Sequence, residues 1–129
     1  KENVPWAKFV LEDIVTVDTS KLQTFDVVVS SFTLHHITYE NQGKAIRNMI
    51  ELCKEHGSIL IFDRSYRNEK EKELFELKLA EEGNFEKLDI IRSESYLIED
   101  NITPFIHYLG YQIKTFSFEN HIWGFLIQK

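Results

Sequence analysis

Residues 25–37 read FDVVVSSFTLHHI, an apolar run that passes into two serines and then into two adjacent histidines. The three consecutive valines favour a β-strand over residues 25–31, because β-branched side chains pack well on a pleated surface. An unbroken apolar run of this kind is typical of a strand that is buried on both faces. The stretch therefore predicts a buried strand that ends in a short polar loop.

The residues that follow predict a crossover back into the same sheet. Helical spacing of apolar residues indicates a helix that starts near residues 38–41 and runs to about His56, with Gly57 as a left-handed cap. Residues 58–62, SILIF, form a second apolar strand that ends at Asp63. Strand, helix and strand in this order predict a right-handed crossover between parallel strands.

The flanking segments extend this α/β pattern on both sides. Residues 7–17 mix aromatic and β-branched side chains and read as a strand. Asn68 and Glu71 form a capping-box pattern, with Asn68 as the N-cap of a helix that runs to about Glu82 and is closed by Gly83. We expect residues 84–102 to be partly helical and a further helix to begin at Thr103–Pro104 and end at Gly110. The two apolar runs of residues 111–129 predict an antiparallel hairpin.

Composition limits the classes of function. The chain has 129 residues, a size that predicts a single domain over residues 1–129, and its formal net charge of −6 argues against broad contact with a nucleic-acid backbone. Its one cysteine, Cys53, excludes an internal disulfide and a cysteine-rich zinc site, and suits a cytoplasmic setting. No apolar run approaches the roughly 20 residues that span a bilayer, and no signal peptide is evident, so we expect no membrane partner.

Four stretches in this order resemble the second half of a class I S-adenosylmethionine-dependent methyltransferase. They are FVLEDI, FDVVVSSFTLHHI, IRNMIELCKEHGSILIFDRSY and FIHYLGYQIKTF, which resemble the family's third strand, fourth strand, fifth strand with its preceding helix, and sixth strand. Each stretch alone is weakly specific, whereas their order and spacing cover nearly the whole chain. The resemblance implies a partial Rossmann-like sheet of parallel strands with an antiparallel C-terminal hairpin.

The resemblance also implies S-adenosyl-L-methionine as cofactor and a role for particular residues in binding it. Asp13 would accept a hydrogen bond from the adenine amino group, and Ile14 would pack on the adenine ring. Ser30 and Ser31 lie at the carboxyl end of a strand, where open α/β sheets bind ligands. Small residues there would let backbone carbonyls approach the methionyl ammonium group.

The histidine pair would lie beside the transferred methyl group. The resemblance places Leu34 and His35 at its flanks, and His36 is the candidate general base, because histidine titrates near neutrality. Adjacent loop residues seldom point the same way, so at most one histidine reaches the substrate, and packing or capping is the alternative role for both. No third ligand lies nearby in the sequence, so we expect no metal site.

One departure from the family's pattern is large. The family's first strand is followed by a glycine-rich turn for the cofactor, and none of the five glycines of this chain lies close enough to another to form one. The sequence thus reads as an N-terminally truncated domain. In the family's strand order, 3-2-1-4-5-7-6, loss of strands 1 and 2 would leave residues 25–31 as an exposed apolar edge, which invites pairing. We therefore expect either a complementing N-terminal half or a homo-oligomer.

Three functions are considered for this chain. The first is methyl transfer to a small-molecule acceptor, with the isolated chain inactive because its cofactor site is incomplete. The second is a non-catalytic methyltransferase-like subunit or pseudo-enzyme. A tRNA acceptor stays open, because FSFENHIWGFLIQK is distantly similar to family members that modify a wobble uridine. The third, a nicotinamide-dependent dehydrogenase, would also need a glycine-rich turn and normally lacks the terminal hairpin.

Overall fold

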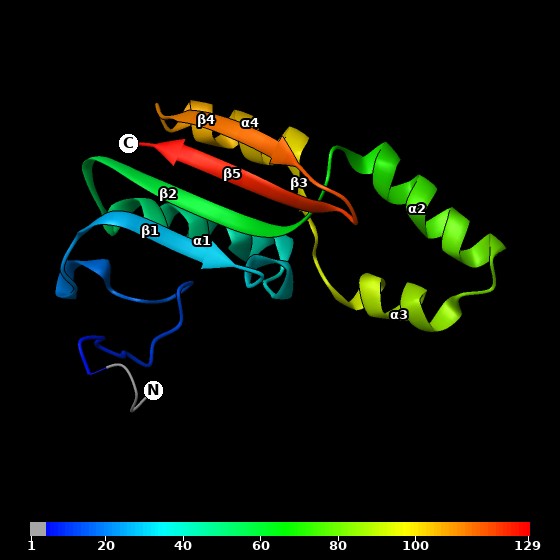
Figure 1. Cartoon of the computed structure of the whole chain (residues 1–129), viewed down its shortest axis with the longest axis horizontal. Coiled ribbons are helices and arrows are strands. Elements are labelled where there is room, and N and C mark those ends of the chain that lie inside the picture. The colour runs from blue at the N-terminus through cyan, green and yellow to red at the C-terminus, as the bar shows by residue number, and fades with distance from the viewer. Residues whose placement is uncertain (1–4) are drawn as a thin grey trace.

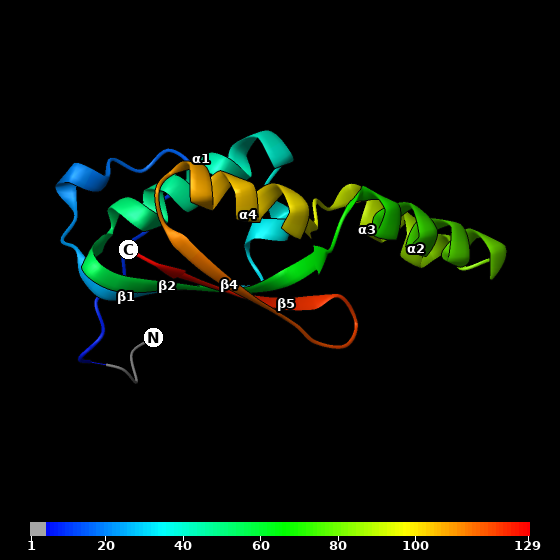
Figure 2. The ribbon, with the colours of Figure 1, turned by 90° about the horizontal axis from the view of Figure 1, so that it is seen from above.

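The structure, a computed structural model that describes residues 5–129, is a twisted sheet with helices on one of its faces (Figures 1 and 2). Its strands are β1 (Phe25–Ser31), β2 (Cys53–Tyr66), β3 (Leu97–Ile98), β4 (Gln112–Ser117) and β5 (Ile122–Gln128). Its α-helices are α1 (Tyr39–Glu51), α2 (Glu69–Glu81), α3 (Phe85–Ser93) and α4 (Glu99–Tyr108), and two short 3-10 helices are η1 (Thr19–Lys21) and η2 (Leu34–His36).

The strand order of the main sheet is β1-β2-β5-β4. β1 and β2 are parallel and are joined by α1, whereas β5 pairs antiparallel with both β2 and β4. The short β3 pairs with the carboxyl end of β2. The predicted α/β sheet with an antiparallel C-terminal hairpin is thus confirmed, and its strand order corresponds to 4-5-7-6 of the methyltransferase sheet.

The main core lies between the sheet and the two helices that cover it, α1 and α4 (Figure 2). On α1, the side chains of Ala45, Ile46, Met49 and Ile50 are buried at helical spacing, as the sequence predicted. Alternate residues of the central strands meet them from the sheet, and these are Ile59, Ile61, Phe125 and Ile127.

Helices α2 and α3 extend away from the sheet and pack on each other (Figure 1). Leu79 of α2 and Leu88 and Ile91 of α3 form a second, smaller buried cluster. The predicted N-cap of α2 is confirmed, because the Asn68 side chain accepts a hydrogen bond from the Glu71 backbone N–H at 2.9 Å. Gly83 follows the helix with a φ of 72°, in the left-handed region that glycine adopts most readily.

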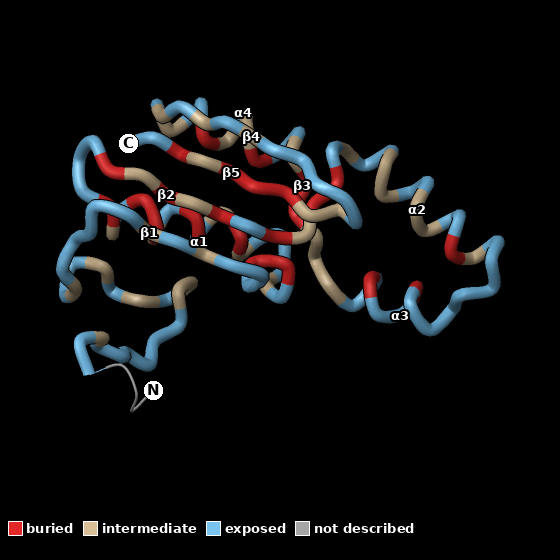
Figure 3. The backbone as a smooth tube through the Cα atoms, viewed as in Figure 1, coloured by how far each residue is buried: buried red, intermediate tan, exposed pale blue. Residues whose placement is uncertain are grey.

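The burial of β1 differs from the expectation drawn from its valines. Val27 and Val29 are 53% and 60% exposed, and β1 forms one edge of the sheet (Figure 3). Only Val28 packs against the core, because it faces α1. Burial of both faces was therefore a wrong prediction: within residues 5–129, β1 has a neighbouring strand on one side alone, and the helices of this part of the chain cover only one face of the sheet (Figure 2).

The strand predicted for residues 7–17 is also absent. This segment runs irregularly and forms a turn at residues 14–16, in which Asp13 O accepts the backbone N–H groups of Thr16 and Val17. A strand needs a neighbour to pair its backbone groups. None of the strands in residues 5–129 lies alongside this segment, so its apolar residues do not suffice to make it a strand.

The boundaries of α1 and β2 differ from those predicted. The helix ends at Glu51 instead of about residue 56, and β2 runs through Asp63 to Tyr66. The left-handed residue is His56, with a φ of 65°, whereas Gly57 lies within β2. Residues 54–57 bulge between the pairs Phe25↔Cys53 and Val27↔Ser58. β2 therefore begins at Cys53, before Gly57, whereas the sequence predicted that the strand follows Gly57.

Helix α4 begins at Glu99, four residues before the predicted start at Thr103. The pairing of β3 with β2 brings the chain to this point, and the acidic residues Glu99 and Asp100 stabilise the first turn. Pro104 lies inside the helix, and the Thr103 hydroxyl, predicted to be a cap, is buried without a hydrogen-bond partner. Within the described part of the chain, none of the helices is long and apolar enough to cross a bilayer.

Candidate functional site

The chain turns sharply where β1 ends. Phe32 adopts a φ of 50°, and its backbone N–H donates to Phe62 O at 2.8 Å. A bulky residue with positive φ is uncommon and marks a position that its surroundings constrain. The turn brings the next residues across the neighbouring strand, over Asp63 of β2.

Asp63 holds this loop in place. Its side chain is fully buried, and its Oδ2 accepts the backbone N–H groups of Thr33 and Leu34 at 3.2 and 2.8 Å. Its Oδ1 accepts the backbone N–H of Arg64 at 2.8 Å and lies 2.6 Å from Nδ1 of His35. A buried carboxylate is stabilised only when its oxygens are paired, and here both oxygens are.

A cavity of about 250 Å³ lies at the carboxyl end of β1. Four residues predicted to bind the cofactor line it together, although they come from separate parts of the sequence: Ile14, Ser30, Ser31 and Leu34. Val28, Val29, Thr33 and Met49 complete the lining. Leu34 is buried, whereas Ser30 is half-buried and Ser31 is exposed at the strand end, so the cavity is lined by both apolar and polar side chains.

Asp13 precedes Ile14 on an exposed turn. Its carboxylate Oδ1 accepts the backbone N–H of Val15 at 2.8 Å. The turn is fixed to α1 by Asn48, whose side-chain amide donates to Ile14 O at 2.7 Å. Within residues 5–129 the second carboxylate oxygen of Asp13 has no hydrogen-bond partner, and the adenine-binding role of this residue stays a prediction.

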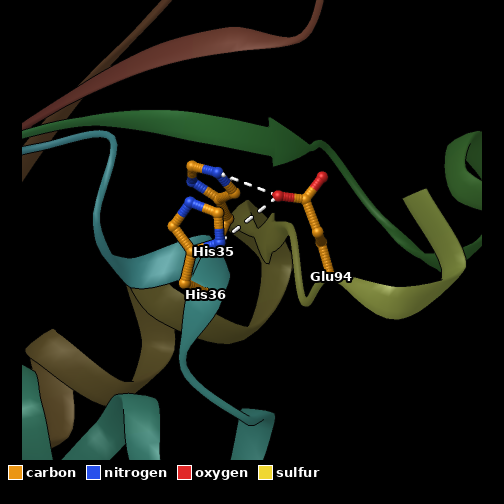
Figure 4. A group of neighbouring side chains, drawn as sticks. All are labelled: His35, His36 and Glu94. Atoms are coloured by element: carbon orange, nitrogen blue, oxygen red, sulfur yellow. Dashed lines mark ion pairs between the residues drawn. The ribbon is translucent and has the colours of Figure 1, made fainter. Parts of the chain in front are cut away.

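The histidine pair lies beside Glu94 (Figure 4), and neither histidine is among the residues that line this cavity. The side chain of His35 is buried between Asp63 and Glu94, and its Nε2 is 3.2 Å from Glu94 Oε2. The side chain of His36 is 64% exposed, and its Nδ1 is 3.4 Å from the same glutamate oxygen. Neither ring lines the cavity, so the roles of His35 beside the methyl group and of His36 as a base stay predictions.

Gln42 joins the histidine loop to the segment that carries Glu94. Its buried side-chain amide donates to Leu34 O and Ile37 O, both at 3.1 Å, and to Ser95 O at 2.6 Å. The Ser95 backbone N–H donates in turn to His35 O at 2.8 Å. These bonds fix the distance between two segments that are far apart in the sequence.

Two tyrosines beside the histidine loop do not suit proton abstraction at neutral pH. Tyr66 and Tyr96 stack with ring centroids 5.2 Å apart, and Tyr96 meets the His35 ring edge-on at 6.0 Å. Burial raises the pKa of both hydroxyl groups. Both therefore stay protonated near neutrality.

Sequence reasoning missed two residues of the site, Gln42 and Glu94, and left Asp63 open between the substrate side of the crevice and an ordinary charged loop position. Asp63 gave a usable signal, because a carboxylate directly after SILIF interrupts an apolar strand and needs buried partners. Gln42 falls on the apolar side of α1, where an amide is out of place. Glu94 gave no signal, because nothing local in the sequence associates it with residues 35 and 36.

Comparison with known proteins agrees with this architecture. A model of the methyltransferase domain matches residues 1–61. An uncharacterized methyltransferase of Alkaliphilus oremlandii is 24% identical over 123 residues, which are 95% of this chain and 56% of that protein. One of Staphylococcus carnosus is 28% identical over 108 residues, 83% of this chain and 52% of that protein. The chain thus spans about half the length of these relatives.

Solved structures share the fold at low sequence identity. An O-methyltransferase family protein from Burkholderia thailandensis superposes with a TM-score of 0.71 at 14% identity, over 95% of this chain and 35% of that one. Human N-acetylserotonin methyltransferase, solved in complex with S-adenosylmethionine, superposes with a TM-score of 0.61 at 13% identity, over 92% of this chain and 32% of that one. The fold is that of the methyltransferase sheet. These matches and the shared fold support the resemblance of this chain to the class I S-adenosylmethionine-dependent methyltransferases.

Proposed function

We propose that this chain supplies one side of an S-adenosyl-L-methionine site in an enzyme that methylates a small molecule. The cavity at the end of β1 carries the proposal, because Ile14, Ser30, Ser31 and Leu34 converge on it from separate segments. Its volume of about 250 Å³ is below the roughly 300–1,000 Å³ of complete ligand sites. A cavity of this size fits part of a cofactor site better than a whole one.

The chemistry asks mainly for positioning. The sulfonium of the cofactor is already a good leaving group, so in-line transfer to a nucleophile needs an oriented acceptor and a dry pocket. The net charge of −6 favours a small metabolite over a nucleic acid, and a tRNA acceptor is the less favoured alternative. The single cysteine, Cys53, is buried and unpaired with another cysteine, which suits the cytoplasmic setting that we propose.

We expect the isolated chain to be inactive. Its sequence holds no glycine-rich turn for the cofactor, and β1 is an open edge where the family's sheet continues. The same edge favours the second candidate function, a non-catalytic subunit that acts only through a partner. The two candidates differ in whether the cavity binds the cofactor at all.

The test is a titration of the 129-residue chain with S-adenosylhomocysteine, in which calorimetry measures the affinity and amide chemical shifts identify the residues that bind. We expect saturable binding weaker than micromolar, with shifts centred on Ile14, Ser30 and Leu34. Ser30→Leu fills the cavity and should abolish these shifts, whereas Ser117→Leu, on the far strand β4, should leave them unchanged. No binding at millimolar ligand would favour the non-catalytic module, and micromolar binding would show that the chain holds a complete cofactor site.

A further inference from the structure

The two histidines and Glu94 form a cluster of metal-ligating atoms that sequence spacing did not predict (Figure 4). His35 Nε2, His36 Nδ1 and Glu94 Oε2 all lie within 4.8 Å of one another. The nitrogen-to-oxygen distances are 3.2 Å from His35 and 3.4 Å from His36. The sequence offered no third candidate ligand near the two histidines along the chain. In the structure the third candidate is Glu94, which directly follows α3.

The hydrogen bond between His35 and Asp63 prepares the ring for a metal. Asp63 Oδ1 lies 2.6 Å from Nδ1 of His35, so in the neutral ring the proton belongs on Nδ1 and the lone pair on Nε2. That lone pair then faces an oxygen of Glu94 at 3.2 Å. Two acceptors at this distance repel unless a second proton or a cation lies between them, and a carboxylate behind a histidine is the usual support of a metal ligand.

The three ligands are held by a rigid frame. Asp63 fixes the histidine loop through two backbone N–H groups, and the Gln42 side chain donates to carbonyl groups on both sides of the cluster. The Ser95 N–H bond to His35 O at 2.8 Å places Glu94 beside the histidines. A metal site gains affinity when its ligands are positioned before the ion arrives, and these bonds do so.

We propose that His35, His36 and Glu94 bind a divalent first-row transition metal, with Zn²⁺ as the best match. Two imidazole nitrogens and one carboxylate oxygen are a ligand set that Zn²⁺ uses in catalytic sites. Bonds of about 2.0–2.1 Å in a tetrahedron place neighbouring ligand atoms about 3.3 Å apart. The observed 3.2 and 3.4 Å match this spacing. Three protein ligands leave a fourth position for water or for an oxygen, nitrogen or sulfur atom of a bound molecule.

The site does not depend on the cofactor, so it is tested on the chain alone. The 129-residue chain is freed of metal with a chelator and titrated with Co²⁺, whose visible absorption reports tetrahedral coordination, and Zn²⁺ is then added as competitor. We expect one Co²⁺ per chain, displaced by one Zn²⁺. His36→Ala and Glu94→Gln each remove one ligand from a partly exposed position and should weaken Zn²⁺ binding about tenfold or more.

The control is His107→Ala, which removes an exposed histidine from α4, away from the cluster. It should bind Zn²⁺ as the unaltered chain does. Circular dichroism of each variant, with and without the metal, separates loss of a ligand from loss of the fold. A folded chain that shows no Co²⁺ absorption would overturn the proposal and leave the cluster as an ion-paired group, and so would equal binding by the His36→Ala and His107→Ala variants.

Discussion

Gly57 shows how a single residue fixes the bulge near the start of β2. A Cβ atom added at this position would lie 2.5 Å from Cys53 Sγ and 2.7 Å from Asp26 O. The latter is a backbone atom of the neighbouring strand, and it cannot move without disturbing the pairing of β1 with β2. Glycine is therefore required by close approach and not by a left-handed φ, which is why its predicted role as a cap was wrong.

Gly57→Ala should lower the free energy of unfolding by about 2 kcal/mol or more, because the added methyl group overpacks the space between β2 and β1. Equilibrium unfolding in urea measures this change. The matched control is Gly43→Ala in α1, where a Cβ would meet Phe105 at an ordinary 3.7 Å. Alanine suits a helix interior, so the control should be neutral or more stable by up to about 1 kcal/mol. Equal stability of the two variants would contradict the packing argument.

The residues of the site differ in how far the sequence could predict them. Ser30, Ser31 and Leu34 could be predicted to lie together because they stand at the end of a recognisable strand or just after it, and they do line one cavity, whereas their role in binding stays a prediction. Glu94 could not be found, because its position depends on Gln42, whose amide bonds three carbonyl groups from two segments. Sequence patterns report periodicity along the chain, whereas this hydrogen-bonded join exists only once the chain has folded.

At the scale of elements, helix α2 is the clearest case in which local sequence decided the outcome. Asn68 was predicted to cap it, and its side chain accepts the Glu71 N–H at 2.9 Å. The helix lies away from the main core and buries only Leu79, so its stability depends heavily on its ends. Residues 7–17 are the opposite case. Their side chains favour a strand, but none of the described strands pairs with them, and they do not form one.

Asn68→Ala should destabilise α2 by about 1 kcal/mol, because it leaves a backbone N–H of the first turn without its partner. Amide hydrogen exchange along α2 should become about fivefold faster, while exchange in β2 and β5 stays unchanged. Asn68→Asp keeps an acceptor at the cap and should exchange like the unaltered chain. Unchanged exchange in Asn68→Ala would mean that packing on α3, and not the cap, holds the helix.

At the scale of the whole molecule, the sheet has one covered face and one bare face. Helices α1 and α4 lie on the covered face (Figure 2), and large apolar side chains are exposed on β1, β2 and β4 or the loop after β4. These side chains are Val27, Val29, Phe62, Phe116 and Phe118. The strand order could be predicted because the motifs occur in family order, whereas the burial of β1 could not, because it depends on which neighbours the strand has, and within residues 5–129 only β2 pairs with it.

We propose that the isolated chain associates with a second copy through the outer edge of β1, because none of the strands of residues 5–129 pairs with that edge, and Val27 and Val29 are exposed on the same strand. Sedimentation velocity at micromolar concentration should show a dimer or larger species. Val29→Lys places a charge on the edge, where Val29 is 60% exposed, and should shift the population toward monomer. Leu77→Lys changes a side chain of similar exposure, 55%, on α2 and should leave the association unchanged.

A folded chain that sediments as a monomer at every concentration would contradict this proposal. Equal association of the Val29→Lys and Leu77→Lys variants would also contradict it, because it would show that self-association does not use the edge of β1. If Val29→Lys prevents association and Leu77→Lys does not, the edge of β1 is the surface through which two copies bind each other. The oligomeric state then depends on this unpaired strand edge and not on the stability of the core.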